Sequence, residues 1–192
     1  MIHEETLTAM HINSAQELTP AQLLETLREQ KRKIEPMMPL EETFAIYSQG
    51  RKLAEAAVKA YPSHPELLEE TAFYNYNVGL SHIKQADLAR EDFISKGNDK
   101  AHASKHFMSE LIALYEEALP PLWRSYEIHK EADNARQADY DLKALQNAAD
   151  KMKGVVGILQ GTVKKALDGI EQRTASHRVF KSDGMEPIIG KA

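Results

Sequence analysis

Four potential metal ligands lie close together between residues 99 and 110. Asp99, His102, His106 and Glu110 are spaced three, four and four residues apart, which places all four on one side of a helix. Two histidines four residues apart can bind one metal ion. A di-iron bundle, however, needs Glu-x-x-His motifs on different helices, and the sequence contains no such motif. We therefore favour a polar helix flank and expect no cofactor, and we keep the four residues as candidates for a metal site.

Two aromatic features could also contribute to a binding site. Residues 74–77 read Tyr-Asn-Tyr-Asn and could either bind a ligand inside a helical bundle or hydrogen-bond between helices, and the second interpretation is favoured because buried hydroxyls and amides need partners. Trp123 follows two consecutive prolines. It is expected to pack at a break in the helix or, alternatively, to bind a partner protein.

Catalytic chemistry finds little support in the sequence. The chain has no cysteine, which excludes thiolate catalysis, disulfides and cysteine-bound metals. It also lacks a Gly-x-Ser-x-Gly motif and a glycine-rich phosphate loop. A noncatalytic role is therefore favoured, and an enzyme is kept as the alternative.

Composition and charge limit the possible partners. The chain has 192 residues, 42% of them hydrophobic, and a net charge of -5 without a long basic block, which argues against a nucleic-acid partner and against an anionic membrane surface. No apolar run approaches the roughly 18 residues of a membrane-spanning helix. The first residues are acidic rather than basic, so no secretory signal is predicted, and a cytoplasmic location is the default expectation.

The hydrophobic pattern predicts an all-α protein, an antiparallel bundle of five or six helices. Thr19 and Gln22 predict a capping box at the start of the first helix, and Ser63 with Glu66 predicts another at the start of the third. Asp133 and Asn134 predict a cap before the last helix. The prolines at 120–121 should break or kink the fourth helix. The expected helices cover residues 20–35, 40–60, 63–97, 99–131 with that interruption, and a long final helix from 135.

The final helix has the longest regular pattern. Its apolar residues alternate at spacings of three and four over five heptads, which predicts one apolar face packed antiparallel on the third and fourth helices. Glycines at 154, 157 and 161 predict either a close approach of another backbone or a break near residue 154. The predicted face contains Ala135, Ala138, Leu142, Leu145, Ala149, Met152, Val156, Leu159, Val163, Ala166 and Ile170.

The segment 50–72 resembles one boundary between tetratricopeptide repeats. Gly50, Ala57 and Pro62, followed by Leu68 and Ala72, match the family's order of small, small, proline, large and small residues. The pattern departs where the family has large side chains, and no second copy follows at a 34-residue period. The resemblance implies a helix-hairpin scaffold that binds other proteins. The departing positions are Ala54, Thr71 and Asn75.

The predicted domain organisation is an N-terminal arm at 1–17, a helical bundle at 18–173 and a C-terminal tail at 174–192. In the tail, Met185, Ile188 and Ile189 are the apolar residues that could insert into a groove on another subunit. The leading hypothesis is therefore a noncatalytic interaction protein or structural subunit that binds a protein partner, with a second copy of itself in a homo-oligomer as one candidate. The alternative is a bundle-type enzyme or binder with a small-molecule or metal site near His102 and His106.

Overall fold

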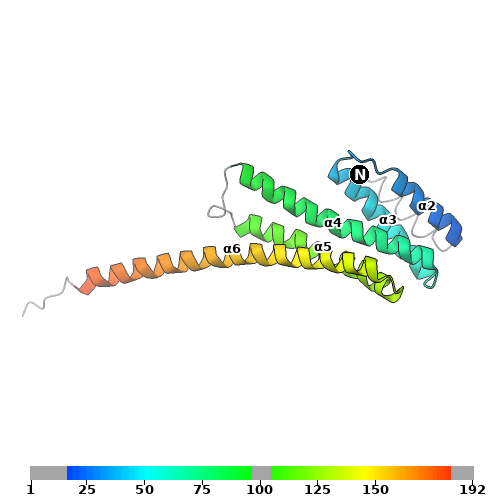
Figure 1. Cartoon of the computed structure of the whole chain (residues 1–192). Helices are drawn as coiled ribbons and strands as arrows, with labels where there is room; N and C mark the ends of the chain where they lie inside the picture. The colour runs from blue at the N-terminus through cyan, green and yellow to red at the C-terminus, as the bar shows by residue number, and fades with distance from the viewer. Residues whose placement is uncertain (1–16, 97–104, 183–192) are drawn as a thin grey trace, which may run out of the picture.

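The computed structural model describes residues 17–96 and 105–182, and this part of the chain forms five helices. Figure 1 shows the helices packed side by side in a bundle, with the last helix running far past the others. The predicted all-α bundle with a long C-terminal helix is thus confirmed. The helices are α2 (Pro20–Arg32), α3 (Leu40–Ala60), α4 (Pro65–Ser95), α5 (Lys105–Glu131) and α6 (Ala135–Ser182).

Local capping sets the start of two helices as the sequence predicts. At the start of α2, the Thr19 hydroxyl accepts a hydrogen bond from the Gln22 backbone N–H at 3.3 Å, and the Gln22 side chain accepts one from the Thr19 N–H at 2.9 Å. Before α6, Asp133 adopts a left-handed backbone with φ of 54°, and the Asn134 side chain accepts from the N–H of Gln137. Both predicted caps are confirmed.

Two other local predictions need correction. The Ser63–Glu66 capping box does not form, because α4 begins after His64, whose side chain makes no capping bond, and Pro65 occupies the first turn. Of the break or kink predicted at the prolines at 120–121, the break does not occur, since α5 continues through them to Glu131.

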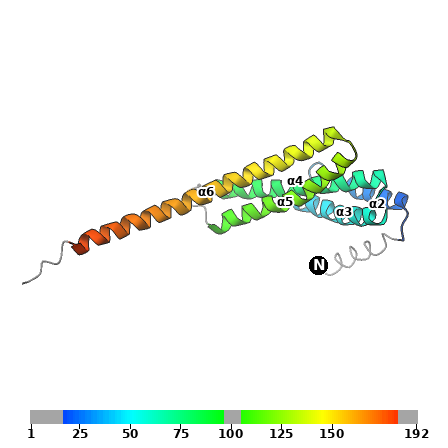
Figure 2. The ribbon, with the colours of Figure 1, turned by 90° about the horizontal axis from the view of Figure 1, so that it is seen from below.

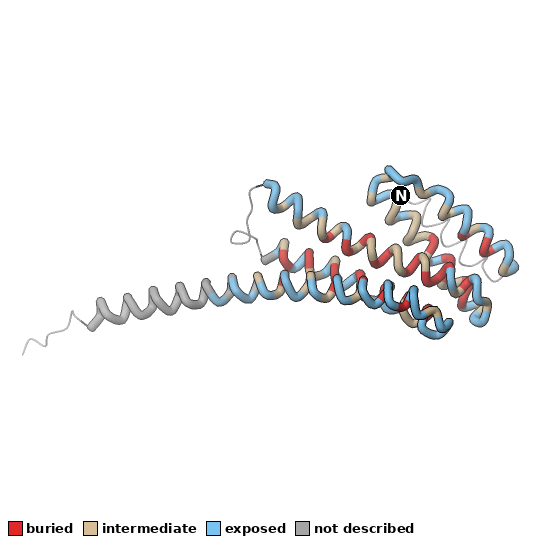
Figure 3. Tube along the Cα trace, viewed as in Figure 1, coloured by how far each residue is buried: buried red, intermediate tan, exposed pale blue. Residues whose placement is uncertain are grey.

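The bundle contains two core clusters joined by α4. One cluster packs α2 and α3 against the first half of α4, and the other packs α5 and α6 against its second half. Figure 3 shows the buried residues along the inner sides of these helices. The first cluster contains Leu23, Leu24, Leu27, Leu53, Ala54, Ala57, Val58, Leu67 and Tyr74, and the second contains Ile83, Ala86, Met108, Leu111, Tyr115, Ala118, Leu122, Ala144, Ala148 and Val155.

Two glycines allow α4 to pack closely on its neighbours. A Cβ atom on Gly50 would lie 2.0 Å from Cε1 of Tyr74, and one on Gly79 would lie 2.4 Å from Cγ of Leu122. Such distances are far inside van der Waals contact, so the large side chain occupies the space that each glycine leaves. The α3–α4 and α4–α5 pairs therefore require glycine at these positions.

The buried face of α6 is rotated from the predicted one. Asp141, which is not part of the predicted face, is only 1% exposed. Leu142 and Ala135, which are part of it, are exposed, Leu142 to 38%. The difference arises because Asp141 has polar partners on α5. These contacts bury a face of α6 that is rotated by about one residue position from the predicted face. The buried residues of the described part of α6 are Ala138, Asp141, Ala144, Ala148 and Val155.

Neither predicted role of the α6 glycines is correct. The helix continues past Gly154, and a Cβ on Gly154, Gly157 or Gly161 would meet no described atom within 4 Å. These glycines lie on the exposed side of the helix. The predicted packing is also modified, because α6 packs mainly along α5 and touches α4 at few positions. The expected boundary between bundle and tail, at residue 173, falls inside α6.

Candidate functional site

The predicted metal ligands are only partly visible. Asp99 and His102 lie outside the described residues. His106 Nε2 lies 3.1 Å from Oε1 of Glu110 one turn later, and both side chains are exposed on α5. Within residues 17–96 and 105–182, no group of three or more histidine or acidic side chains is placed to bind a metal ion. The four-residue metal site therefore stays a prediction.

Trp123, a predicted partner-binding residue, lies on the surface. Its side chain is 51% exposed, its Nε1 donates to Glu127 at 2.9 Å, and its ring lies 5.4 Å from that of Tyr126. The expectation that it packs at a break in the helix is wrong, because α5 continues through the prolines and the indole is exposed. A role in partner binding stays a prediction. The other predicted partner-binding residues, Met185, Ile188 and Ile189, lie outside the described residues.

Two of the four residues at 74–77, Tyr74 and Asn75, hydrogen-bond between helices, as the favoured interpretation predicts, whereas Asn77 donates to the carbonyl oxygen of Phe73 in its own helix. The buried Tyr74 hydroxyl donates to the carbonyl oxygen of Leu27 in α2 at 2.6 Å, and burial raises the pKa of Tyr74. Asn75 donates to Glu55 in α3 at 2.7 Å. These bonds connect α4 to both helices of the first core cluster.

A buried polar cluster at the α5–α6 interface was not predicted. The Asp141 carboxylate accepts from the Ser125 hydroxyl through one oxygen, at 2.9 Å, and contacts Nδ1 of His129 through the other, at 2.6 Å. All three side chains are buried. A sequence signal existed, since residues 138, 141, 145, 148, 152 and 155 also alternate at three and four, with one aspartate among apolar residues.

The contacts in this cluster are those of a structural connection between α5 and α6. Burial lowers the pKa of His129, but the hydrogen bond and negative charge of Asp141 outweigh this, so that the pKa is raised overall. The imidazole also lies 3.7 Å from Glu69 of α4. In a catalytic triad the serine hydroxyl faces the imidazole. Here Ser125 and His129 each bind the carboxylate, which favours fixing the α5–α6 register over nucleophilic catalysis.

A second polar cluster connects three helices farther along the bundle. Asp87 of α4 accepts a hydrogen bond from the Tyr115 hydroxyl of α5 at 3.0 Å and pairs with Lys151 of α6. Burial and then the hydrogen bond to Asp87 raise the pKa of Tyr115 to about 12. A neutral tyrosine therefore donates to a charged carboxylate, the stronger kind of hydrogen bond. The cluster sets the relative positions of α4, α5 and α6.

An open groove lies between α3 and α4. It encloses about 460 Å³ and has Val78 and His82 of α4 along one side. Phe44 of α3 contacts the His82 ring edge to face, with ring centroids 4.9 Å apart. Arg51 and Lys52 are among the charged residues that line it. The groove therefore combines an aromatic ring, an imidazole and charged side chains on one concave surface.

The extension of α6 is the second candidate surface. The helix has 48 residues, whereas the described part of α5, along which it packs, has 27. The excess of about 20 residues corresponds to a length of about 30 Å. Figures 1 and 2 show α6 continuing as a single helix beyond α4 and α5 in two perpendicular views. None of the described helices has both the length and the apolar content that a bilayer span needs.

Comparison of the chain with protein-family models, with curated proteins and with solved structures found no match.

Proposed function

We propose that this protein is a noncatalytic helical scaffold that associates with a protein partner, a second copy of itself in the first instance, through the extension of α6. The observation that carries the proposal is the length of α6 relative to the bundle. Val155 is the last buried residue in the described part of this helix, and the helix continues to Ser182.

The sequence of the extension supports helix pairing. Apolar residues at 156, 159, 163, 166 and 170 keep the three-four spacing, and the flanking positions 160, 162, 167 and 169 hold no charged residue. A helix of this length with an apolar stripe is stabilised when the stripe is buried against another helix. Uncharged flanks also avoid repulsion between two identical helices.

The character of the polar clusters supports a scaffold over an enzyme. Asp141 and Asp87 both use their carboxylate oxygens to connect side chains from neighbouring helices. Such contacts fix the bundle as a rigid support for the extension. A metal or small-molecule function near His106 has weaker support, because its described part is one exposed ion pair.

Sedimentation of the full chain tests the proposal. The variant Val163→Glu with Ile170→Glu places two charges in the apolar stripe. The control, Lys165→Gln with Gln172→Glu, changes the net charge by the same amount on the opposite side of the helix. We expect wild type and control to sediment above the 21.6 kDa of one chain and the stripe variant to sediment as a monomer. Monomers for all three proteins at concentrations of about 100 μM, where weak association is populated, would refute self-association.

A further inference from the structure

One face of α3 is left uncovered by the described helices. Leu53, Ala54 and Ala57 are buried against α2 and α4. The α3 residues that line the groove instead recur every three to four positions from Phe44 to Lys59. Because α3 spans 21 residues, the groove follows most of its length. Its α3 residues are Phe44, Ser48, Arg51, Lys52, Glu55, Ala56 and Lys59.

The groove has an excess of positive charge. Arg51, Lys52 and Lys59 line it, and among the described residues none of them has a carboxylate partner. Glu55, the acidic residue of the lining, is already engaged by Asn75 at 2.7 Å and by Arg124 at 3.8 Å. In a chain with net charge -5, a groove with three uncompensated cations is selective for an acidic occupant.

The groove also offers aromatic and polar surface. Phe44 is half-buried against His82 and presents apolar surface to the groove, whereas Val78 is only 2% exposed. His82 Nδ1 is buried and lies 3.3 Å from Oε2 of Glu117, although the two atoms do not form a hydrogen bond. Burial, which outweighs the nearby Glu117 carboxylate, lowers the pKa of His82. An occupant that matches this surface combines acidic side chains with apolar ones.

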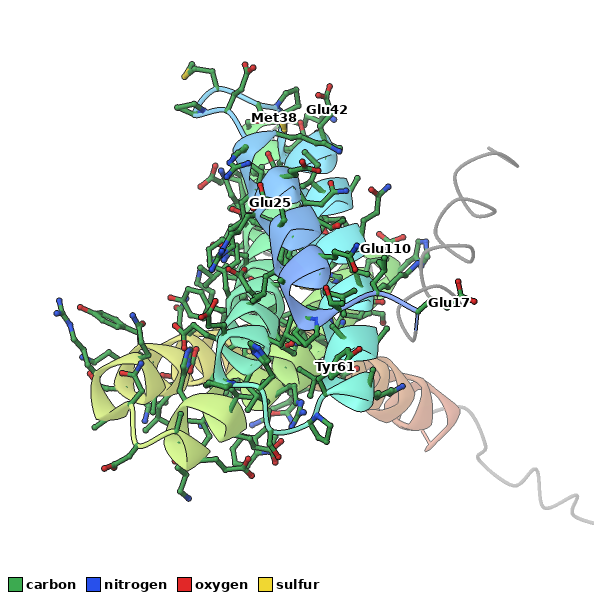
Figure 4. All side chains as sticks on the ribbon, turned by 90° about the vertical axis from the view of Figure 1, so that its right-hand side faces the viewer. Glu17, Glu25, Met38, Glu42, Tyr61 and Glu110 are labelled. Carbon is green, nitrogen blue, oxygen red and sulfur yellow. The ribbon has the colours of Figure 1, made fainter. Side chains whose placement is uncertain are left out.

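We propose that the acidic N-terminal segment of this chain, residues 1–16, binds in the groove between α3 and α4. The described chain begins near the C-terminal end of α3, the helix that supplies most of the groove lining. The Tyr61 hydroxyl donates to the carbonyl oxygen of Leu18 at 2.8 Å, and Lys59, two residues before Tyr61, lines the groove. Figure 4 shows Glu17 and Tyr61 at the same end of the bundle.

The length and composition of the segment fit the groove. From Phe44 to Lys59 the helix rises about 22 Å, which matches a 16-residue helix, and an extended chain of that length reaches about 50 Å. The segment contains Glu4 and Glu5 and no lysine or arginine. Its apolar residues include Ile2, Leu7, Met10 and Ile12.

The tether favours this occupant over a foreign acidic peptide. A segment joined directly to the groove has an effective concentration in the millimolar range, so a weak interaction is enough to keep it bound. A foreign peptide would have to displace it. The segment thereby becomes a built-in competitor for any acidic partner of the groove.

Cross-linking in the full chain tests the proposal, and the absence of native cysteines makes the labelling specific. One protein carries Thr8→Cys with Ser48→Cys in the groove. The reference carries Thr8→Cys with Lys153→Cys on the exposed side of α6. We expect a short bis-maleimide to cross-link the groove pair about tenfold or more faster within one chain.

Charge variants of the groove pair complete the test. Arg51→Glu with Lys59→Glu should bring its cross-linking rate down to that of the reference pair. The control, Lys84→Glu with Arg136→Glu, makes the same charge change at exposed positions away from the groove and should leave the rate unchanged. Equal rates for the groove and reference pairs would overturn the proposal, as would cross-links that form only between chains. Equal losses in both charge variants would also overturn it.

Discussion

Replacing Gly50 with alanine tests the close packing of α3 on α4. The added Cβ would lie 2.0 Å from Cε1 and 2.4 Å from Cζ of Tyr74. An ordinary contact is 3.4–4 Å, so the ring would have to move by more than 1 Å. It has little room to do so, because Tyr74 is fully buried, contacts the rings of Tyr47 and Phe73, and donates a hydrogen bond to Leu27.

The expected change in the free energy of unfolding combines three effects. Overpacking a core costs about 1–3 kcal/mol, and loss of the Tyr74 hydrogen bond costs about 1 kcal/mol. The better helix propensity of alanine offsets about 1 kcal/mol of this. Gly50→Ala should therefore destabilise the protein by about 1–3 kcal/mol.

The matched control is Gly154→Ala, at an exposed helix position with no described atom within 4 Å of the new Cβ. It should stabilise the protein by about 0.5–1 kcal/mol, because alanine is the better helix former. Urea unfolding followed by circular dichroism measures both changes as shifts of the midpoint at constant slope. Stabilisation of similar size by both substitutions would refute the claim that Tyr74 fills the space beside Gly50.

Three further predictions concern the polar clusters. Asp141→Ala should destabilise the protein by about 3 kcal/mol, because it leaves buried polar groups without their partner; urea unfolding measures this, and a loss below about 1 kcal/mol, as for an ordinary surface substitution, would contradict it. The pKa of His129 is raised above its ordinary value of 6.5, so its stabilising contribution is complete below pH 6.5 and is lost as pH rises through the higher folded-state pKa. The stability advantage of wild type over His129→Gln should therefore shrink from pH 6 to 8, and an advantage that grows over this range would have the wrong sign. Tyr115→Phe should cost about 1 kcal/mol, because Asp87 loses one donor but keeps Lys151; an unchanged urea midpoint would show that this bond adds no stability.

The sequence predicts the elements of the fold well because their signals are local. The predicted bounds of the helix at 40–60 agree with α3, and the Thr19 and Asn134 caps form as expected. Capping and proline effects act within one turn, and the sequence displays them directly. The second capping box fails for a local reason too, since Pro65 starts α4 two residues after Ser63.

The sequence predicts the polar clusters poorly because they depend on which helix faces are in contact. Two stripes at three-four spacing lie next to each other on α6, and apolar counting favours the one that contains Leu142. The partners of Asp141 are 12 and 16 residues away on another helix, and they make the adjacent stripe the buried one. The sequence does not predict the groove either, because the groove lining combines α3 residues with Val78 and His82 of α4.

The exposed glycines of α6 have a thermodynamic consequence for assembly. Each glycine lowers helix stability by about 1 kcal/mol relative to alanine, so the three at 154, 157 and 161 together lower it by about 3 kcal/mol. Since none of them gains a packing contact in the described structure, the helix beyond the bundle has less intrinsic stability than its length implies. An association that requires this helix is weakened in proportion to the fraction of molecules in which it is formed. The glycines would thus keep such an assembly reversible while the bundle itself stays folded.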